Sequence, residues 1–558
     1  MKTNPPADNA HAKDYRKILS KMFENNLKEF APAGMEKQKV LISYSYGDKR
    51  AVTCPGIGNT IKTAYESARN TVLKKIKDKS SVPVWTCMDF VTNEEKVDRN
   101  EFYERVSNTR TNYYRYGIAL DDFYQISFLE QELNGAGLID YKQSPVVLNA
   151  NNVTKHLRYK GVFGSKQEFS PDNTDKVIVF GSKSCFYDAE NGEYYNLHSD
   201  GLEKGIRKAE ADREFLIDQI KKTTGYLNGT ANDDGSFVYG YFPCYGGAVP
   251  GYNAIRHILS VISLIDCYEY TPSSELKENI KKCYDYIMRE AYKAIDENSS
   301  VIVDHANGDE IRLGALGLAI LMIVKYSDFT GDTGQLDAAK KLANFILRMQ
   351  DEADGSFNHV LRYPDLSLKE KFKIVYYSGE ACYGLMAIYG RDPDERYLNA
   401  SKRAFDFFIK NDYHKYFDHW LAYAANEVTK YAPDDKIFEF GIKNALSMID
   451  FIIERETTFA TFLEMLNASG GLFERIEESG KGYLFEGYEK EKFYQALKIR
   501  VKRQLNGVMF PEMAMFFKNP RQILYGVYIR HHTFRIRDDD VAHHLIGYRN
   551  YLKNRQPQ

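Results

Sequence analysis

Helical segments of two kinds alternate after about residue 200, and this alternation most constrains what the 558-residue chain can fold into. The segment 335–350 has its apolar residues on one face and charged residues elsewhere, so it should have one wet side. The segment 313–324 is apolar all round and rich in glycine and alanine, so other helices should enclose it. Such a chain must wrap one layer of helices around another.

The periodicity predicts about twelve helices in this part of the chain. Their expected spans are 206–226, 251–270, 275–297, 310–327, 333–350, 376–390, 394–410, 418–431, 434–453, 457–469, 485–507 and 538–553. The second member of each pair is the apolar one, which predicts six enclosed helices surrounded by six amphipathic ones. We therefore expect a mainly α fold with a C-terminal (α/α)6 toroid of six hairpins, and an open helical solenoid is its main rival.

The segment before residue 200 has a different pattern. Short β-branched runs of strand length occur at 40–45, 84–90 and 176–180, between helical stretches such as 13–30 and 60–77. The sequence therefore predicts an N-terminal helix or arm at 1–35, a smaller α+β domain at 36–204 and the toroid at 205–558. A cap over the toroid, an oligomer contact and a substrate-positioning domain remain open as roles for the α+β domain.

Composition argues against several classes of function. With 75 basic and 77 acidic residues the net charge is -2, which gives no field to gather nucleic acid or a membrane surface. The polar N-terminus has no apolar signal-peptide core, and the longest apolar run is about a dozen residues, so we expect a cytoplasmic protein. The seven scattered cysteines predict neither disulfides nor a structural zinc site.

Unusual polar groups gather where the enclosed helices should begin. The sequence Asp-Gly-Ser-Phe occurs twice, at 234–237 and 354–357, and either copy could simply form a β-turn. The segment 530–544 packs ten ionisable groups into fifteen residues and runs into an apolar stretch. Because all enclosed helices of an antiparallel toroid begin at one end, we expect these groups to converge on one cavity. Asp418 and one of Asp538–Asp540 could equally be helix N-caps.

On these residues the chain resembles the (α/α)6-toroid carbohydrate-active enzymes, a superfamily of glycoside hydrolases, uronate lyases and sugar epimerases. The resemblance covers about residues 205–555. It rests on the helix alternation, on Tyr-Tyr-Ser-Gly-Glu at 376–380, on Asp-Glu-Arg-Tyr-Leu at 394–398 and on Asp-His-Trp at 418–420. It implies a sugar-containing substrate and supports the scaffold better than any particular reaction.

Hydrolysis of a glycosidic bond is the reaction that we expect first, because it needs only two carboxyl groups. The candidate catalytic residues are Glu380, Asp234, Asp354, Asp418 and Asp539. Glu380 is favoured as the acid, since its apolar helix could raise the pKa of its carboxyl group. Tyr377 and Trp420 are expected to stack on sugar rings.

A uronate-directed lyase or an epimerase is the main alternative, because it would need a cation and a histidine or tyrosine that moves a ring proton. The other predicted substrate-binding residues suit it: Arg256, His257, His419, Arg535, Arg537 and His543. A non-catalytic glycan-binding or polysaccharide-assembly component is the third hypothesis. Terpene-cyclase-like and lanthionine-cyclase-like toroids fit less well. We predict no cofactor and no defined metal site, although the abundance of His and Asp leaves other metal use open.

Overall fold

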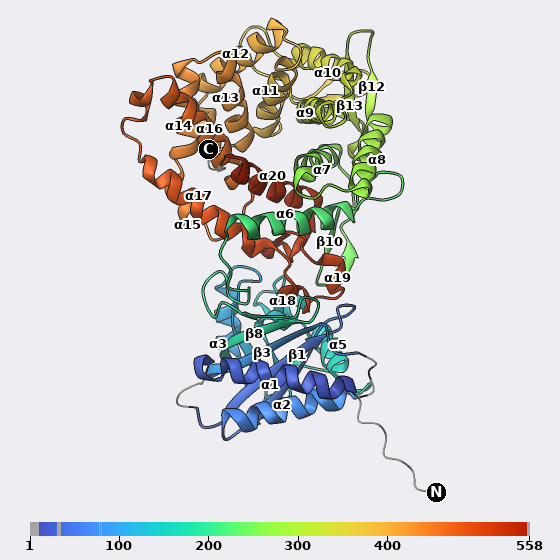
Figure 1. The fold of residues 1–558 in the computed structure, drawn as a ribbon, viewed down its shortest axis with the longest axis vertical. Helices are drawn as coiled ribbons and strands as arrows, with labels where there is room; N and C mark the ends of the chain where they lie inside the picture. Colours follow the sequence, from blue (N-terminus) through green and yellow to red (C-terminus); the bar gives the residue numbers. More distant parts are fainter. Residues whose placement is uncertain (1–9, 31–34, 78, 80, 555–558) are drawn as a thin grey trace. The chain divides into compact units, whose positions relative to one another are not determined.

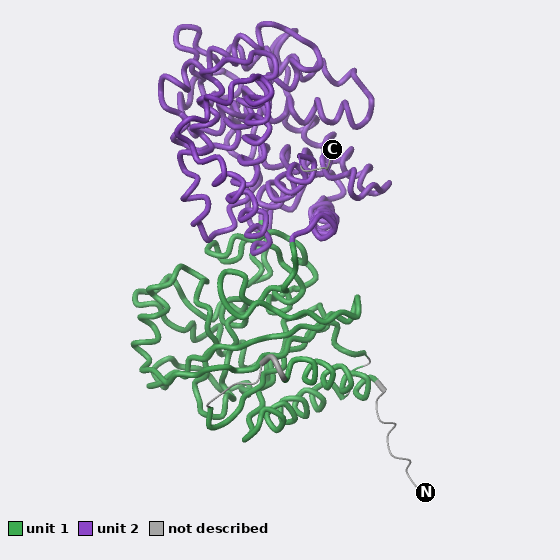
Figure 2. Tube along the Cα trace, turned by 60° about the vertical axis from the view of Figure 1, so that its left-hand side comes forward, with its two compact units in different colours: residues 1–210, 241–247, 508–536 green, residues 211–240, 248–507, 537–558 purple. Residues whose placement is uncertain are grey.

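The computed structural model describes residues 10–30, 35–77, 79 and 81–554. The chain divides into two compact units, which Figure 2 colours separately. Residues 1–210, 241–247 and 508–536 make up the N-terminal unit, and residues 211–240, 248–507 and 537–558 make up the helical unit. Three stretches of the predicted toroid range 205–558 thus belong to the N-terminal unit: 205–210, 241–247 and 508–536. Parts of the predicted arm, 1–9 and 31–34, lie outside the described residues.

An antiparallel sheet is the centre of the N-terminal unit, in the order β2-β1-β3-β8-β4-β5, with β9 paired to β8. Its strands are β1 (Gln38–Ser45), β2 (Val52–Gly58), β3 (Trp85–Asp98), β4 (Gly117–Ala119), β5 (Ser127–Phe128), β8 (Lys176–Asp188) and β9 (Glu193–Asn196). Helices α1 (Ala10–Phe30) and α2 (Ile61–Ile76) bury their apolar faces against one side of the sheet. Further helices are α3 (Arg99–Ser107), α4 (Glu130–Gly135) and α5 (Ala150–Lys160).

The helical unit is a closed double ring (Figure 1). Within the described residues its inner layer has six helices: α7 (Ala254–Cys267), α9 (Leu313–Thr330), α11 (Tyr376–Tyr389), α13 (His419–Tyr431), α16 (Thr461–Glu478) and α20 (Asp538–Asn554). Each packs against the next, and α20 packs against α7, which closes the ring and excludes an open solenoid. The outer helices are α6 (Arg213–Asn228), α8 (Ser274–Glu290), α10 (Leu336–Met349), α12 (Glu395–Lys410), α14 (Asp435–Leu446) and α17 (Lys490–Gln504).

Glycines allow the inner helices α9 and α11 to approach each other closely. A Cβ atom on Gly317 would collide with the backbone of Glu380, and one on Gly384 would collide with the backbone of Gly317. Side chains at these positions would push the two helices apart and leave voids beside them. The apolar sequence of α9 therefore predicts its enclosed position correctly.

The helical unit also holds a small antiparallel sheet that the sequence pattern did not predict. Its strands are β12 (Tyr292–Ala294), β13 (Ser300–Asp304), β14 (Glu310–Arg312), β15 (Val360–Arg362) and β16 (Leu368–Glu370). All are three to five residues long, too short for alternation to reveal them. This sheet ties together the loops that lead into α9 and α11. The predicted helix 434–453 is in fact two, α14 and α15 (Ile449–Glu454).

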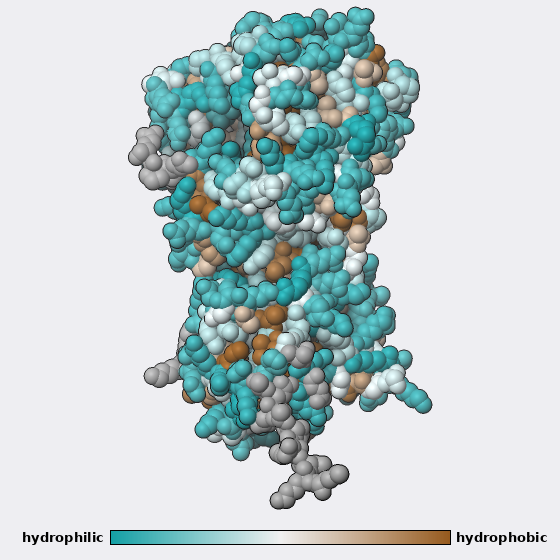
Figure 3. All heavy atoms as spheres, turned by 45° about the vertical axis from the view of Figure 1, so that its right-hand side comes forward, coloured by the Kyte–Doolittle hydropathy of each residue, from teal (hydrophilic) through white to brown (hydrophobic). Residues whose placement is uncertain are grey.

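The surface and the cysteines fit these two packed units. On the face shown in Figure 3 most side chains are hydrophilic, and the hydrophobic ones form small separate patches. One described helix, α9, is long and apolar enough to cross a membrane, but 78% of it is buried inside the ring. All seven cysteines are buried and free.

Candidate functional site

Two histidines and a glutamate from three inner helices meet at the end where those helices begin. We call His419, Glu464 and His543 the histidine cluster. His419 is the first residue of α13, and Glu464 and His543 lie in the first two turns of α16 and α20. One potential ligand atom from each residue lies within 4.8 Å of the others. The expected convergence of polar groups therefore occurs for these three helices.

Glu464 is the buried anchor of the histidine cluster. Its side chain is fully buried, and its Oε1 atom accepts a hydrogen bond of 2.6 Å from Nδ1 of His543. Its Oε2 atom accepts one of 3.1 Å from the hydroxyl of Tyr423. Burial alone would lower the pKa of His543, but the adjacent Glu464 carboxylate outweighs burial and raises it. The positively charged form of His543 is therefore favoured.

His419 faces His543 and keeps one ring nitrogen without a partner. The ring centroids of the two histidines are 5.2 Å apart, with the planes nearly perpendicular. Nδ1 of His419 lies 3.3 Å from the carboxylate of Asp418, whereas the buried Nε2 has no hydrogen-bond partner among the described residues. Buried polar atoms are rarely unpaired, so this nitrogen is a candidate for a functional role.

Glu380 and Asp418 form a buried carboxyl pair next to His419. Burial first, and then the neighbouring Asp418, raise the pKa of Glu380 well above its usual range, which confirms the direction expected from its apolar helix. The Oε2 atom of Glu380 has no hydrogen-bond partner among the described residues. Asp418 caps α13, because its Oδ2 atom accepts a bond of 2.9 Å from the backbone N–H of Leu421.

Asp539 is held between two arginines and is not a free carboxylate. Arg256 lies 2.8 Å from it and Arg537 lies 3.0 Å from it. Arg537 also bonds to Asp540, at 3.1 Å. These arginines were predicted to receive an anionic substrate, but the acidic first turn of α20 already neutralises them.

The two Asp-Gly-Ser-Phe copies are turns outside this group. Asp234 accepts a bond of 2.9 Å from the backbone N–H of Ser236, and Asp354 accepts one of 2.8 Å from that of Ser356. Both aspartates are exposed. Each following glycine has a positive φ and packs closely on an outer-layer helix, as the turn interpretation predicts. The structure therefore does not bring these two predicted catalytic residues to the histidine cluster.

Three other predicted residues also have local partners. His257 is buried between the hydroxyl of Tyr252 and the carbonyl of Cys283, and burial lowers its pKa to about 4. Arg535 belongs to the N-terminal unit, where it bonds to His532 at 3.2 Å. Tyr377 is nearly buried, with its ring beside Gly314 and 5.7 Å from that of His359. These contacts explain each side chain without a substrate.

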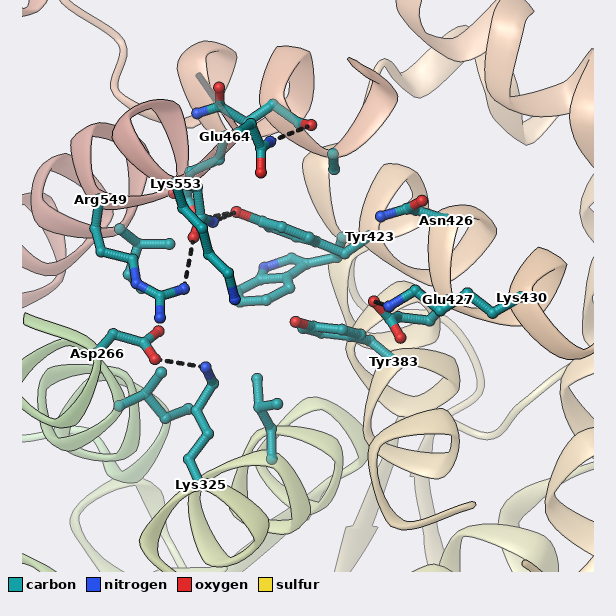
Figure 4. A pocket seen from close by; sticks show the side chains of 18 residues that line it. Asp266, Lys325, Tyr383, Tyr423, Asn426, Glu427, Lys430, Glu464, Arg549 and Lys553 are labelled. Atoms are coloured by element: carbon teal, nitrogen blue, oxygen red, sulfur yellow. Dashed lines mark hydrogen bonds and ion pairs between the residues drawn. The ribbon is translucent and has the colours of Figure 1, made fainter. Parts of the chain in front are cut away.

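A cavity of about 260 Å³ opens inside the ring, and we call it the lumen pocket (Figure 4). All inner helices contribute to its wall: Ile262, Asp266, Leu321, Lys325, Tyr383, Trp420, Tyr423, Asn426, Glu427, Lys430, Glu464, Asn467, Ala468, Ile546, Arg549, Asn550, Lys553 and Asn554. Trp420 was predicted to bind substrate, and it lines this pocket with its ring 4.8 Å from that of His419. Trp420 and Glu464 thus link the pocket to the histidine cluster.

Sequence reasoning left Glu464 and most of the lumen pocket unassigned. Glu464 did carry a signal, because it is a lone acidic residue between Phe462, Leu463, Met465 and Leu466. A charge inside an apolar helical run is seldom buried without a partner. The residues of the lumen pocket follow later in the same helices, where amphipathic spacing does not separate lumen-facing charges from solvent-facing ones.

Comparisons with known proteins give similar structures but no sequence relatives. No protein-family model and no curated protein sequence matches the chain. Similar solved structures include a D-mannose isomerase, with 10% identity, a TM-score of 0.47 and coverage of 62% of this chain and 98% of that one. A cellobiose 2-epimerase from Bacillus thermoamylovorans B4167 has 10% identity, a TM-score of 0.46 and coverage of 61% and 99%. An unsaturated glucuronyl hydrolase from Streptococcus agalactiae has 13% identity, a TM-score of 0.44 and coverage of 64% and 98%.

By their names these three neighbours are an isomerase, an epimerase and a hydrolase of sugars, and their likeness to this chain is one of fold alone. At such low identity no reaction is carried over from them to this chain.

Proposed function

We propose that this protein is an enzyme that moves a proton on a sugar, as an aldose–ketose isomerase or an epimerase. The observation that carries the proposal is that His419 and His543 face each other. His543 donates a hydrogen bond to Glu464, whereas Nε2 of His419 has no hydrogen-bond partner among the described residues. This proposal keeps the epimerase that the sequence indicates as an alternative to hydrolysis, but it does not require the substrate to be a uronate.

Each histidine suits one half of the reaction. An isomerase removes the proton on the carbon next to the carbonyl and protonates the carbonyl oxygen, which gives an enediol. A proton then returns to carbon while one enediol hydroxyl gives up its proton to re-form a carbonyl group. His543 is favoured in its charged form by Glu464, so it can donate the proton to the oxygen. The Nε2 atom of His419 can accept the proton from carbon. The raised pKa of Glu380 favours its protonated form, which can donate a hydrogen bond to a sugar oxygen.

Hydrolysis is less well supported by the same geometry. It needs a carboxylic acid and a second carboxylate that is free to activate water or to attack the sugar. Glu380 suits the acid role, but Asp418 is a helix cap and Asp539 is neutralised by Arg256 and Arg537. Asp234 and Asp354 are exposed in turns.

A sugar is the substrate class that the ring interior favours. The lumen pocket combines aromatic rings, from Tyr383, Trp420 and Tyr423, with many amide and charged groups. Aromatic faces bind the apolar faces of sugar rings, and the polar groups can bond to hydroxyls.

A metal-dependent reaction is a second candidate, favoured by one observation. The two histidines and the carboxylate of the histidine cluster have potential ligand atoms close enough to share one ion. Two histidines and one carboxylate bind several divalent transition metals, and such an ion would polarise a carbonyl oxygen. Loss of activity on treatment with EDTA, restored by Mn²⁺ or Co²⁺, would favour this candidate over direct proton transfer.

Product analysis with a panel of neutral and anionic aldoses and disaccharides tests the proposed function. The proposal predicts an isomer or epimer of one substrate with no bond cleaved. His419→Gln should abolish its formation, and the exposed His305→Gln should not. Release of new reducing ends would show hydrolysis, and a new ultraviolet-absorbing double bond would show elimination. Either result would contradict the proposal.

A further inference from the structure

The lumen pocket extends to the end of the ring opposite the histidine cluster. His419 begins α13, whereas Lys430, which lines the pocket, is next to its last residue. At 1.5 Å per residue these positions are about 16 Å apart along the helix axis. Asp266 and Lys553 likewise lie near the ends of α7 and α20. The pocket therefore offers a binding place of its own.

Three cations from two inner helices face one part of this pocket. In Figure 4 the side chains of Lys325, Arg549 and Lys553 point toward one another beside Asp266. Lys325 is paired with Asp266 at 2.6 Å, and Arg549 with Glu269 at 3.1 Å. Lys553 has no ion-pair partner among residues that the structure describes. Three positive charges thus meet two negative ones.

The crowding of these cations affects the pKa of Lys553. Repulsion from Arg549, then burial, then repulsion from Lys325 lower the pKa of Lys553. A bound anion would relieve this repulsion. The last turn of a helix favours a cation, and this accounts for the position of Lys553 on α20. It does not account for Lys325 and Arg549, which lie before the last turns of their helices and point to the same place.

The other wall of the pocket suits a single sugar ring. Tyr383 and Tyr423 stack with centroids 5.2 Å apart and planes 12° apart, and Trp420 lies 6.2 Å from Tyr383. Amide groups of Asn426 and Asn467 complete the wall. The cavity volume of about 260 Å³ is just below the range of ~300–1,000 Å³ for drug-sized ligands, so the cavity matches one sugar ring in size.

We propose that the lumen pocket binds a monosaccharide that carries one carboxylate or phosphate. The anion lies at Lys325, Arg549 and Lys553, and the sugar ring lies beside Tyr383 and Trp420. This proposal rests on the pocket that the proposed function uses for its sugar, but the three cations lie outside the histidine cluster, so binding of the anion can be tested apart from proton transfer. A chain of hydrogen bonds does connect the two places: Arg549 to Asn550, Asn550 to Tyr423, and Tyr423 to Glu464.

Calorimetric titration of the full-length protein at low salt tests the proposal. The probes are D-glucuronate, D-glucose 6-phosphate, neutral D-glucose and inorganic phosphate. We expect one of the two anionic sugars to bind at least about 10-fold more tightly than D-glucose, because its anion adds charged hydrogen bonds that D-glucose cannot make. The preferred probe identifies the anion as carboxylate or phosphate.

Two variants locate the binding. Lys553→Gln removes the cation that lacks a partner and should weaken binding of the anionic sugar about 10-fold. Lys402→Gln, which removes an exposed lysine of outer helix α12, should leave it unchanged. His543→Gln should also bind normally, which separates this proposal from the proposed function.

Several results would overturn the proposal. They are equal affinity for D-glucose and the anionic sugars, unchanged affinity in Lys553→Gln, binding of inorganic phosphate as tight as that of the sugar phosphate, and no binding of either anionic sugar.

Discussion

The carboxylate of Glu464 lies 2.6 Å from Nδ1 of His543, and this pairing joins the fifth and sixth inner helices of the ring. It fixes the orientation of the His543 ring and favours its charged form. A charge as deeply buried as Glu464 needs such a partner, because burying an unpaired carboxylate is costly. The pairing therefore serves both the fold and the proposed chemistry.

Replacing Glu464 by glutamine should move the pH profile of the enzyme. The carboxylate raises the pKa of His543, so wild-type His543 keeps its proton to a higher pH than it would without Glu464. In Glu464→Gln the loss of activity on the basic side should begin at lower pH. The measurement is kcat against pH. Glu474 is an exposed glutamate on the same helix, so Glu474→Gln should keep the wild-type pH profile. If the loss of activity at high pH began at the same pH in Glu464→Gln as in the wild type, Glu464 would not control the pKa of His543.

Gly314 should tolerate no side chain, because it makes room for Glu380. A Cβ atom there would collide with Oε2 of Glu380 and with the ring of Tyr377. Gly314→Ala should therefore cost about 1–3 kcal/mol of unfolding free energy, the usual range for overpacking. Gly225→Ala, in the exposed part of α6 with open space around it, should instead gain about 0.5–1 kcal/mol. Urea unfolding of both variants checks this, and equal effects would argue against the close packing of Glu380.

Buried neutral histidines should make the protein less stable in mild acid. Burial lowers the pKa of His544 to about 3, and the unfolded chain titrates near 6.5. Between these values the unfolded state binds the extra proton, so stability falls as pH falls from about 6.5 toward 3. Neither ring nitrogen of His544 has a hydrogen-bond partner among the residues described, so replacement by leucine leaves no other polar group without its hydrogen bond.

The variant His544→Leu should lose less stability in acid than the wild type does. The variant takes up one proton fewer than the wild type when it unfolds. The slope of its unfolding free energy against pH is therefore smaller by about 1.4 kcal/mol per pH unit between pH 6 and 4. Urea unfolding across this range measures the slope. An identical slope in the two proteins would mean that His544 is already protonated or exposed in the native state.

The ring could be predicted from sequence because each inner helix is apolar over most of its surface. The run Leu313–Val324 can be stable only inside other helices, and its glycines predict the close approach of α9 and α11. The short strands β12–β16 carry too few residues for a periodic signal. The return of segments 241–247 and 508–536 to the N-terminal unit depends on long-range packing, which periodicity does not report.

The site could be predicted only in part, because sequence shows which polar residues begin a helix but not their partners. His419 and His543 were expected at the start of their helices, and they do meet. Asp234 and Asp354 also precede inner helices in the sequence, yet their side chains accept hydrogen bonds within their own turns. Arg256 and Arg537 were expected to bind an anion, but Asp539 from α20 already pairs with both.

Solvent exchange at the carbon next to the sugar carbonyl tests the central claim most directly. The substrate found in the panel is incubated in D₂O with the wild type, His419→Gln and His543→Gln, and the deuterium at that carbon is followed by NMR. We predict uptake by the wild type and a loss of about 10²–10⁴-fold in each variant, as expected for a general acid or base. Deuterium uptake or sugar turnover that survives both substitutions would contradict proton transfer by this pair.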